Sequence, residues 1–107
     1  MNQKTLTMLQ KSIEHWERNA AEKPEDASTR AADCALCGVF NNSYTAENDC
    51  LGCPVYEKTG ETFCEGSPYP RADTALRIWR RFPNSLREKE WREAARDELE
   101  FLKSLLP

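Results

Sequence analysis

The sequence predicts a mainly α-helical fold: a small domain of about three helices with a loop-rich insertion. Apolar residues recur every three or four positions near both ends of the 107-residue chain, as on one face of a helix. Between residues 34 and 70 this period is missing, and the segment holds all five cysteines and three of the six prolines. A chain this short is expected to form one domain, comprising an N-terminal helix and linker (1–33), the cysteine-rich segment (34–70) and C-terminal helices (71–107).

The N-terminal helix is expected to begin at Thr5, whose hydroxyl can cap the first turn, and to end before Pro24. His15 is expected at the edge of its apolar face. Residues 21–33 are polar and predict a linker into the cysteine-rich segment. The apolar face of this helix comprises Leu6, Leu9, Ile13, Trp16 and Ala20.

Two further helices are expected after the cysteine-rich segment. Asp73 can cap the first of them, which Pro83 ends. Ser85 and Glu88 have the spacing of a capping box, which predicts a last helix over residues 86–106. The apolar faces comprise Leu76, Trp79 and Phe82 in the first of these helices, and Trp91, Ala95, Leu99, Leu102 and Leu106 in the second.

The strongest chemical signal is a doubled Cys-x-x-Cys motif, in which Cys34 and Cys37 form one pair and Cys50 and Cys53 the other. Two intervening residues let both sulfurs of a pair reach one ion at about 2.3 Å in tetrahedral geometry. Two pairs complete the coordination of zinc and leave no position for water, which is typical of a structural site. The sequence therefore predicts a zinc-knuckle-like insertion around one structural Zn²⁺.

Cys64 leaves the ligand set open, because zinc takes four ligands and the chain has five cysteines. Cys64 either packs as a small apolar side chain or replaces one of the four ligands, most simply Cys50. The site built from two pairs is favoured, since paired chelation is the simpler geometry. An iron–sulfur or thiol redox centre is the alternative, because Cys-x-x-Cys-Pro also occurs in ferredoxin-type ligation, although the denser cysteine spacing of those proteins is missing.

The distribution of charge and apolar residues bears on the compartment and on partners. The apolar runs are too short for a membrane span, and the first residues lack the pattern of a signal peptide. We therefore expect a cytoplasmic protein, in which cysteines bind metal more readily than they form disulfides. The net charge of −3 is unevenly divided: residues 31–70 carry one basic and six acidic side chains (−5), and residues 71–107 carry nine basic and seven acidic ones (+2).

The cysteines belong to a longer pattern of cysteine, glycine and proline. It reads Cys34-x-x-Cys37, Cys50-x-Gly52-Cys53-Pro54-Val55, Thr59-Gly60 and Cys64-x-Gly66-Ser67-Pro68-Tyr69. This pattern resembles that of a family of small cysteine-rich proteins of bacteriophages and prophages, most of which have threonine at the position of Ser67. The resemblance implies a setting in the cytoplasm of a bacterial host and a single unit containing all five cysteines. It implies no activity.

No catalytic constellation is recognisable, and the chain is not expected to be an enzyme. His15-x-Glu17 followed by Cys34-x-x-Cys37 superficially matches zinc deaminases. Residues two apart on a helix point about 200° apart, so His15 and Glu17 cannot both face one ion. A nucleophilic pair of Cys64 and His15 would need the two side chains to be adjacent, and nothing in the sequence brings them together.

Binding functions remain, and the charge distribution favours a protein partner over nucleic acid. The acidic cysteine-rich segment would repel phosphates. Its tyrosines either pack on the helices or anchor an interface; they are Tyr44, Tyr56 and Tyr69. A basic cluster follows, formed by Arg77, Arg80 and Arg81. This cluster is expected to be a solvated helix face that pairs with the acidic segment, and its alternative role is a face for nucleic acid or an acidic partner.

The sequence thus predicts an interaction module stapled by structural zinc. In the phage setting that the resemblance implies, it is expected to bind a host protein or defence complex as an inhibitor or modulator, with the acidic loops as the contact surface. A zinc-dependent regulator that binds nucleic acid is the alternative. Homodimerisation through the C-terminal stripe of Leu102, Leu105 and Leu106 is a further alternative.

Overall fold

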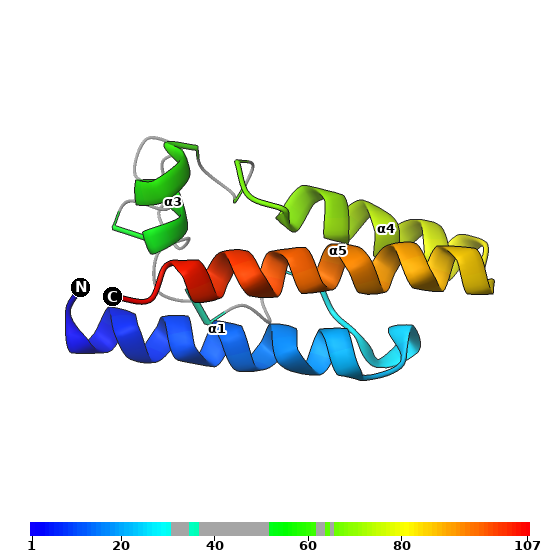
Figure 1. Ribbon diagram of the computed structural model, residues 1–107, viewed down its shortest axis with the longest axis horizontal. Coiled ribbons are helices and arrows are strands. Elements are labelled where there is room, and N and C mark those ends of the chain that lie inside the picture. The colour runs from blue at the N-terminus through cyan, green and yellow to red at the C-terminus, as the bar shows by residue number, and fades with distance from the viewer. Residues whose placement is uncertain (31–34, 37–51, 62–63, 65) are drawn as a thin grey trace.

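The computed structural model describes residues 1–30, 35–36, 52–61, 64 and 66–107 (Figure 1). These residues are mainly helical and include no β-strand, which confirms the expected helical class. The α-helices are α1 (Gln3–Ala21), α3 (Pro54–Thr59), α4 (Tyr69–Arg81) and α5 (Ser85–Ser104), and a 3₁₀-helix, η1 (Pro24–Asp26), follows α1. None of the described helices is both long and apolar enough to cross a membrane.

The long helices are arranged around α5, which packs against both α1 and α4 (Figure 1). α1 and α5 run antiparallel, so the two chain termini lie at one end of the molecule. α3 lies near that end, and the turn between α4 and α5 lies at the opposite end. α1, α4 and α5 thus form a frame of three helices, and α3, which belongs to the cysteine-rich segment, lies near one end of it.

The core of this frame is an aromatic cluster where α1, α4 and α5 meet. The ring centroid of Trp16 lies 6.1 Å from that of Trp91 and 6.3 Å from that of Tyr69, the second pair edge to face. Such aromatic pairs stabilise a core beyond the burial of their area. Nε1 of Trp91 is buried without a hydrogen-bond partner among the described residues, so shape rather than hydrogen bonding suits Trp91 to this position. The other large or apolar buried residues are Leu9, Ile13, Leu36, Val55, Ala72, Leu76, Ala94, Ala95 and Leu102.

The predicted caps of α1 and α5 are each one to three residues too late. Asn2 caps α1, because its side chain accepts a hydrogen bond from the amide of Thr5 at 2.8 Å, and Thr5 lies inside the helix. Asn84 caps α5 in the same way and accepts from the amide of Arg87 at 2.8 Å, so Ser85 is the first helical residue. Both asparagines have the extended backbone that an N-cap requires, with ψ of 167° at Asn2 and 170° at Asn84.

The largest departure from the predicted elements is in and after the cysteine-rich segment. The sequence predicts a loop-rich insertion there, whereas residues 54–59 form α3, which is too short to show a helical period. Pro54 begins α3 because its fixed φ suits the first helical position, and Gly60 ends it at φ 75°. α4 begins at Tyr69, with Pro70 in its first turn, so Asp73 lies inside that helix and does not cap it.

Two residues expected on apolar faces are exposed. Phe82 is 59% exposed, because it lies at the C-cap of α4, where the backbone has left the helix. Leu106 is 41% exposed, because α5 ends at Ser104. Leu102 is buried in the core of its own chain.

Candidate functional site

The structure describes only part of the candidate zinc site. Cys34, Cys37 and Cys50 lie outside the described residues, as does Tyr44. Cys53 is 5% exposed and belongs to the core at the start of α3, and Cys64 is half-buried against that core. Within the described part of the chain, no three cysteine, histidine or carboxylate side chains form a group that could hold a metal ion.

The end of α3 approaches the chain that follows it closely at Thr59 and Gly66. A Cβ atom added at Gly66 would lie 2.6 Å from Cβ of Thr59, closer than real side chains come, so this position requires glycine. The hydroxyl of Thr59 donates to the carbonyl of Val55 at 2.9 Å and accepts from the amide of Glu61 at 3.2 Å. The threonine and glycine of the sequence pattern therefore have structural roles in this turn.

Cys64 begins a tight turn that leads into α4. Its φ of 61° is left-handed, which is uncommon for a residue with a side chain. Ser67 holds this turn: its amide and its hydroxyl donate to the carbonyl of Cys64 at 3.1 and 2.7 Å. The same hydroxyl accepts from the amide of Tyr69 at 3.2 Å. The backbone at Cys64 is thus fixed by Ser67.

A buried carboxylate from α5 lies beside this turn. Glu98 is 2% exposed, and its Oε2 lies 3.4 Å from the hydroxyl of Ser67. The sequence analysis did not single out Glu98, although a signal existed. Glu98 follows Trp91 by two helical turns and so lies on the apolar face of α5, where an acidic residue is unexpected.

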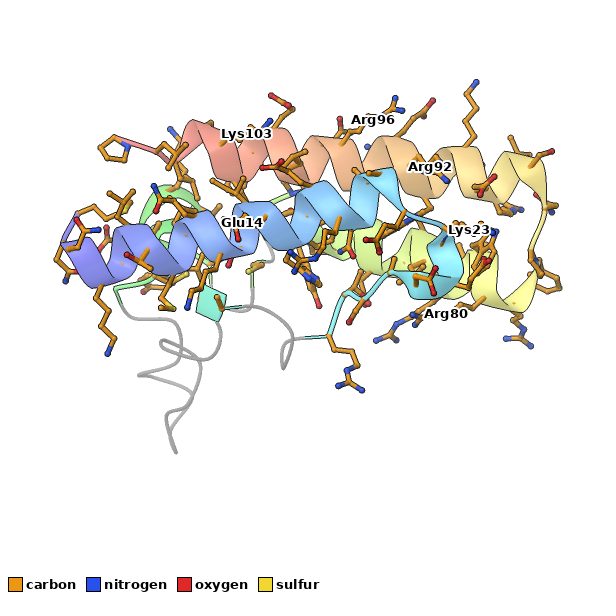
Figure 2. All side chains as sticks on the ribbon, turned by 90° about the horizontal axis from the view of Figure 1, so that it is seen from below. Glu14, Lys23, Arg80, Arg92, Arg96 and Lys103 are labelled. Carbon is orange, nitrogen blue, oxygen red and sulfur yellow. The ribbon has the colours of Figure 1, made fainter. Side chains whose placement is uncertain are left out.

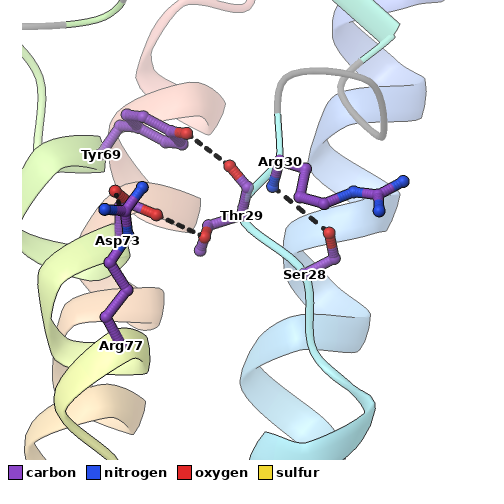
Figure 3. Close-up of polar contacts among 6 residues, drawn as sticks. All are labelled: Ser28, Thr29, Arg30, Tyr69, Asp73 and Arg77. Carbon is purple, nitrogen blue, oxygen red and sulfur yellow. Dashed lines mark hydrogen bonds and ion pairs between the residues drawn. The ribbon is translucent and has the colours of Figure 1, made fainter. Parts of the chain in front are cut away.

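The two ends of the cysteine-rich segment are tied to each other through Thr29 and α4 (Figure 3). The hydroxyl of Tyr69 donates to the backbone carbonyl of Thr29. The side chain of Thr29 in turn donates to Oδ1 of Asp73 at 2.7 Å, and Oδ2 of Asp73 pairs with Arg77 at 3.2 Å. The residues expected to form a free linker are therefore bound to α4 at Thr29.

Residues preceding Thr29 are bound to α1 as well. Asn19 is buried, and its side-chain amide donates to the carbonyl of Ser28 at 2.8 Å while its oxygen accepts from the amide of Ser28 at 3.2 Å. Nε2 of His15 also lies 2.9 Å from that carbonyl. His15 is half-buried beside the apolar face, as expected, and its ring contacts the backbone of this connection and Asn19. These contacts support a structural role for His15.

The described arginines of the basic cluster have three different surroundings. Arg77 pairs with Asp73, a carboxylate of α4 itself, as described above. Nη2 of Arg80 donates to the carbonyl of Ala27 at 2.9 Å, which draws it toward the end of η1 (Figure 2). The guanidinium of Arg81 lies 5.7 Å from the ring centroid of Phe82. Arg80 thus has a structural contact, whereas Arg81 is exposed beside an aromatic ring.

Two of the three tyrosines considered as interface anchors are described, and both are half-buried. Tyr56 and Tyr69 pack against the core. Tyr69 contacts Trp16 edge to face and uses its hydroxyl to bind Thr29. This arrangement agrees with the expectation that tyrosines of the segment pack on the helices.

No family model, curated protein or solved structure matches the chain.

Proposed function

We propose that the chain is a protein-interaction module stapled by one structural Zn²⁺, and that it serves a phage or prophage by binding a host protein or defence complex as an inhibitor or modulator. The proposed ligands are Cys34, Cys37, Cys50 and Cys53, with Cys64 as the alternative to Cys50. The phage setting rests on the sequence pattern alone. Its test is whether the protein binds a component of a bacterial lysate.

The observation that carries the proposal is the way in which the chain holds its described cysteines. Cys53 lies buried against the core at the start of α3, and Cys64 lies at the start of the turn that Ser67 fixes. A cysteine on a fixed backbone loses little conformational entropy when it binds an ion, which supports a structural site. The ligand set itself rests on the spacing of the two Cys-x-x-Cys pairs.

The polar side chains around the segment also support a structural role. Thr59 and Ser67 bond to nearby backbone groups, and Tyr69 bonds to the backbone of Thr29. Such contacts shape a loop and present it to a partner. Polar groups directed at a shared reaction centre would instead support catalysis.

Native mass spectrometry combined with elemental analysis tests the metal. The proposal requires about one zinc ion per chain and its loss on treatment with a strong chelator. Cys50→Ser and Cys64→Ser, each compared with the unchanged protein, separate the two ligand sets, because only the variant that removes a ligand loses zinc. Iron with sulfide, or metal-free protein with oxidised cysteines, would overturn the proposal and favour redox chemistry.

Immobilised zinc-loaded protein tests the interaction. A host protein that is retained by the loaded protein and released by chelator is the expected result. If the host protein is retained equally with and without zinc, the cysteine-rich segment does not present the contact surface.

A further inference from the structure

We propose that the corner between α4 and α5 is a second docking surface, whose partner is an acidic protein segment that also carries apolar side chains. The proposal rests on the proposed function as a protein-interaction module, and it adds the surface and the chemistry of its occupant. This surface, here called the α4–α5 corner, comprises Arg77, Arg80, Arg81, Phe82, Leu86 and Arg87.

Two apolar side chains of the α4–α5 corner, Phe82 and Leu86, face solvent. Phe82 and Leu86 are 59% and 60% exposed, which are the largest values among the large apolar residues that the structure describes. They lie on either side of the turn between α4 and α5, which is at the end of the molecule opposite the termini (Figure 1). A partner that covered both side chains would remove apolar surface from water, which is the main source of affinity at protein interfaces.

The surroundings of these apolar side chains are basic. Residues 74–87 contain four arginines and no acidic residue. Two of these arginines have carboxylate partners: Arg77 pairs with Asp73 at 3.2 Å and Arg87 pairs with Glu90 at 3.0 Å.

The other two arginines of the corner have different contacts. Among the described residues, Arg80 and Arg81 have no acidic partner: Arg80 bonds to the neutral carbonyl of Ala27, and Arg81 lies over the ring of Phe82. Within the part of the chain that the structure describes, these two positive charges therefore have no counter-charge, and that of Arg81 lies beside the exposed ring of Phe82.

These features select the occupant. A second copy of the chain that used the same corner would bring arginines against arginines, which charge repulsion opposes. The phosphates of nucleic acid would neutralise the arginines but would not cover Phe82 or Leu86. An acidic segment with apolar side chains satisfies both parts of the surface, and arginine together with aromatic residues is the composition typical of a protein interface.

The test is a titration of the zinc-loaded, full-length protein with a synthetic helical peptide of about fifteen residues that carries glutamate and leucine on one face. Calorimetry gives the Kd, and NMR locates the shifted resonances. We expect saturable binding with shifts at residues 77–87. We also expect a loss of about tenfold or more in affinity in R80E/R81E and in F82S/L86S.

Matched controls separate the surface from general charge effects. R96E/K103E reverses two charges on the exposed side of α5, away from the corner, and should bind the peptide as the unchanged protein does (Figure 2). Circular dichroism establishes that each variant is folded. Equal binding of a peptide with serine in place of leucine would overturn the proposal, as would tighter binding of a single-stranded oligonucleotide or an equal loss in R96E/K103E.

The outcome is distinguishable from failure of the proposed function. If the peptide does not bind while zinc content and chelator-sensitive capture of a host protein are intact, the docking surface alone is wrong. If the protein contains no zinc but R80E/R81E and F82S/L86S still weaken peptide binding, the proposal of a zinc-stabilised module is wrong. The proposed docking surface is then supported.

Discussion

The hydroxyl of Tyr69 donates a hydrogen bond to the backbone carbonyl of Thr29, forty residues earlier in the chain. Thr29 precedes the cysteine-rich segment and Tyr69 lies at its end, so this bond ties the two ends of the segment together. Because the side chain of Thr29 also donates to Asp73, the connection is made twice. The helical frame thereby closes a long loop, a step that otherwise costs conformational entropy.

Tyr69→Phe removes the hydroxyl from this connection and keeps the ring against Trp16. We expect the free energy of unfolding to fall by about 1 kcal/mol, because a partly buried carbonyl loses its donor. Urea denaturation followed by circular dichroism measures the change. Tyr56→Phe is the matched control, since the hydroxyl of Tyr56 has no hydrogen bond among the described residues, and an equal loss there would contradict the role of the Tyr69 bond.

Asn19→Ala removes both side-chain bonds to the backbone of Ser28 from a buried position. We expect a loss of about 2 kcal/mol of stability, because the amide of Ser28 loses the Asn19 oxygen, its carbonyl loses the Asn19 amide, and a buried polar side chain is removed. Thermal denaturation reports the change. Gln10→Ala, at an exposed position of the same helix, should have little effect. If both variants melt alike, the bonds of Asn19 contribute nothing measurable.

Gly66→Ala and Gly60→Ala should destabilise the chain for different reasons. The added Cβ at residue 66 meets Thr59, whereas Gly60 has open space and only a left-handed backbone. We expect losses of about 2 kcal/mol from overpacking and about 1 kcal/mol from the backbone, respectively.

Asparagine separates the two causes, because it tolerates the left-handed region. Gly60→Asn should therefore be nearly as stable as the unchanged protein, and Gly66→Asn should be at least as unstable as Gly66→Ala. Denaturant titration measures the free energy of unfolding of all four variants. A Gly66→Asn variant that is more stable than Gly60→Asn would refute the close contact with Thr59.

Asn84→Ala tests which residue caps α5. We expect a loss of about 1 kcal/mol, because the amide of Arg87 loses its acceptor. Ser85→Ala should change stability by less than about 0.5 kcal/mol, since alanine suits the first helical turn. Equal and large losses of stability in both variants would instead support Ser85 as a capping residue, as the sequence suggests.

Removal of the proposed zinc should loosen the cysteine-rich segment more than the helical frame. α5 packs against both α1 and α4, and Tyr69 and Thr29 join the ends of the segment without a metal. We expect chelator, or Cys37→Ser, to lower the melting temperature while most of the helical circular dichroism remains at 25 °C. A melting curve unchanged by both treatments would argue against a structural ion.

Local pattern was enough to predict the helical class and the buried faces of α1 and α5. Leu9, Ile13 and Trp16 are spaced by one helical turn, and they are buried as that spacing predicts. α3 was missed, because Pro54 and Gly60 frame a helix too short to repeat its apolar face. Phe82 was placed in the core wrongly, since periodicity does not reveal where the chain leaves a helix.

The candidate site also has some features that local sequence pattern predicts and others that it does not. The doubled Cys-x-x-Cys is a local signal, and it supports the zinc proposal from spacing alone. The contacts of Asn19 with Ser28 and of Thr29 with Asp73 have no such local signal. Ser28 and Thr29 lie in a polar stretch that reads as a linker, and Thr29 and Asp73 are far apart in the chain.

The helical class, the apolar faces and the grouping of cysteines between the helices can be predicted from the sequence, because each depends on residues that are close together in the chain. Tertiary structure alone decided that Tyr69 and Thr29 join the ends of the cysteine-rich segment, that Gly66 must be glycine, and that Phe82 and Leu86 face solvent beside arginines. These features arise when separate elements approach one another. The physical reason is that close packing and hydrogen-bond geometry depend on the distance between elements, which local periodicity does not encode.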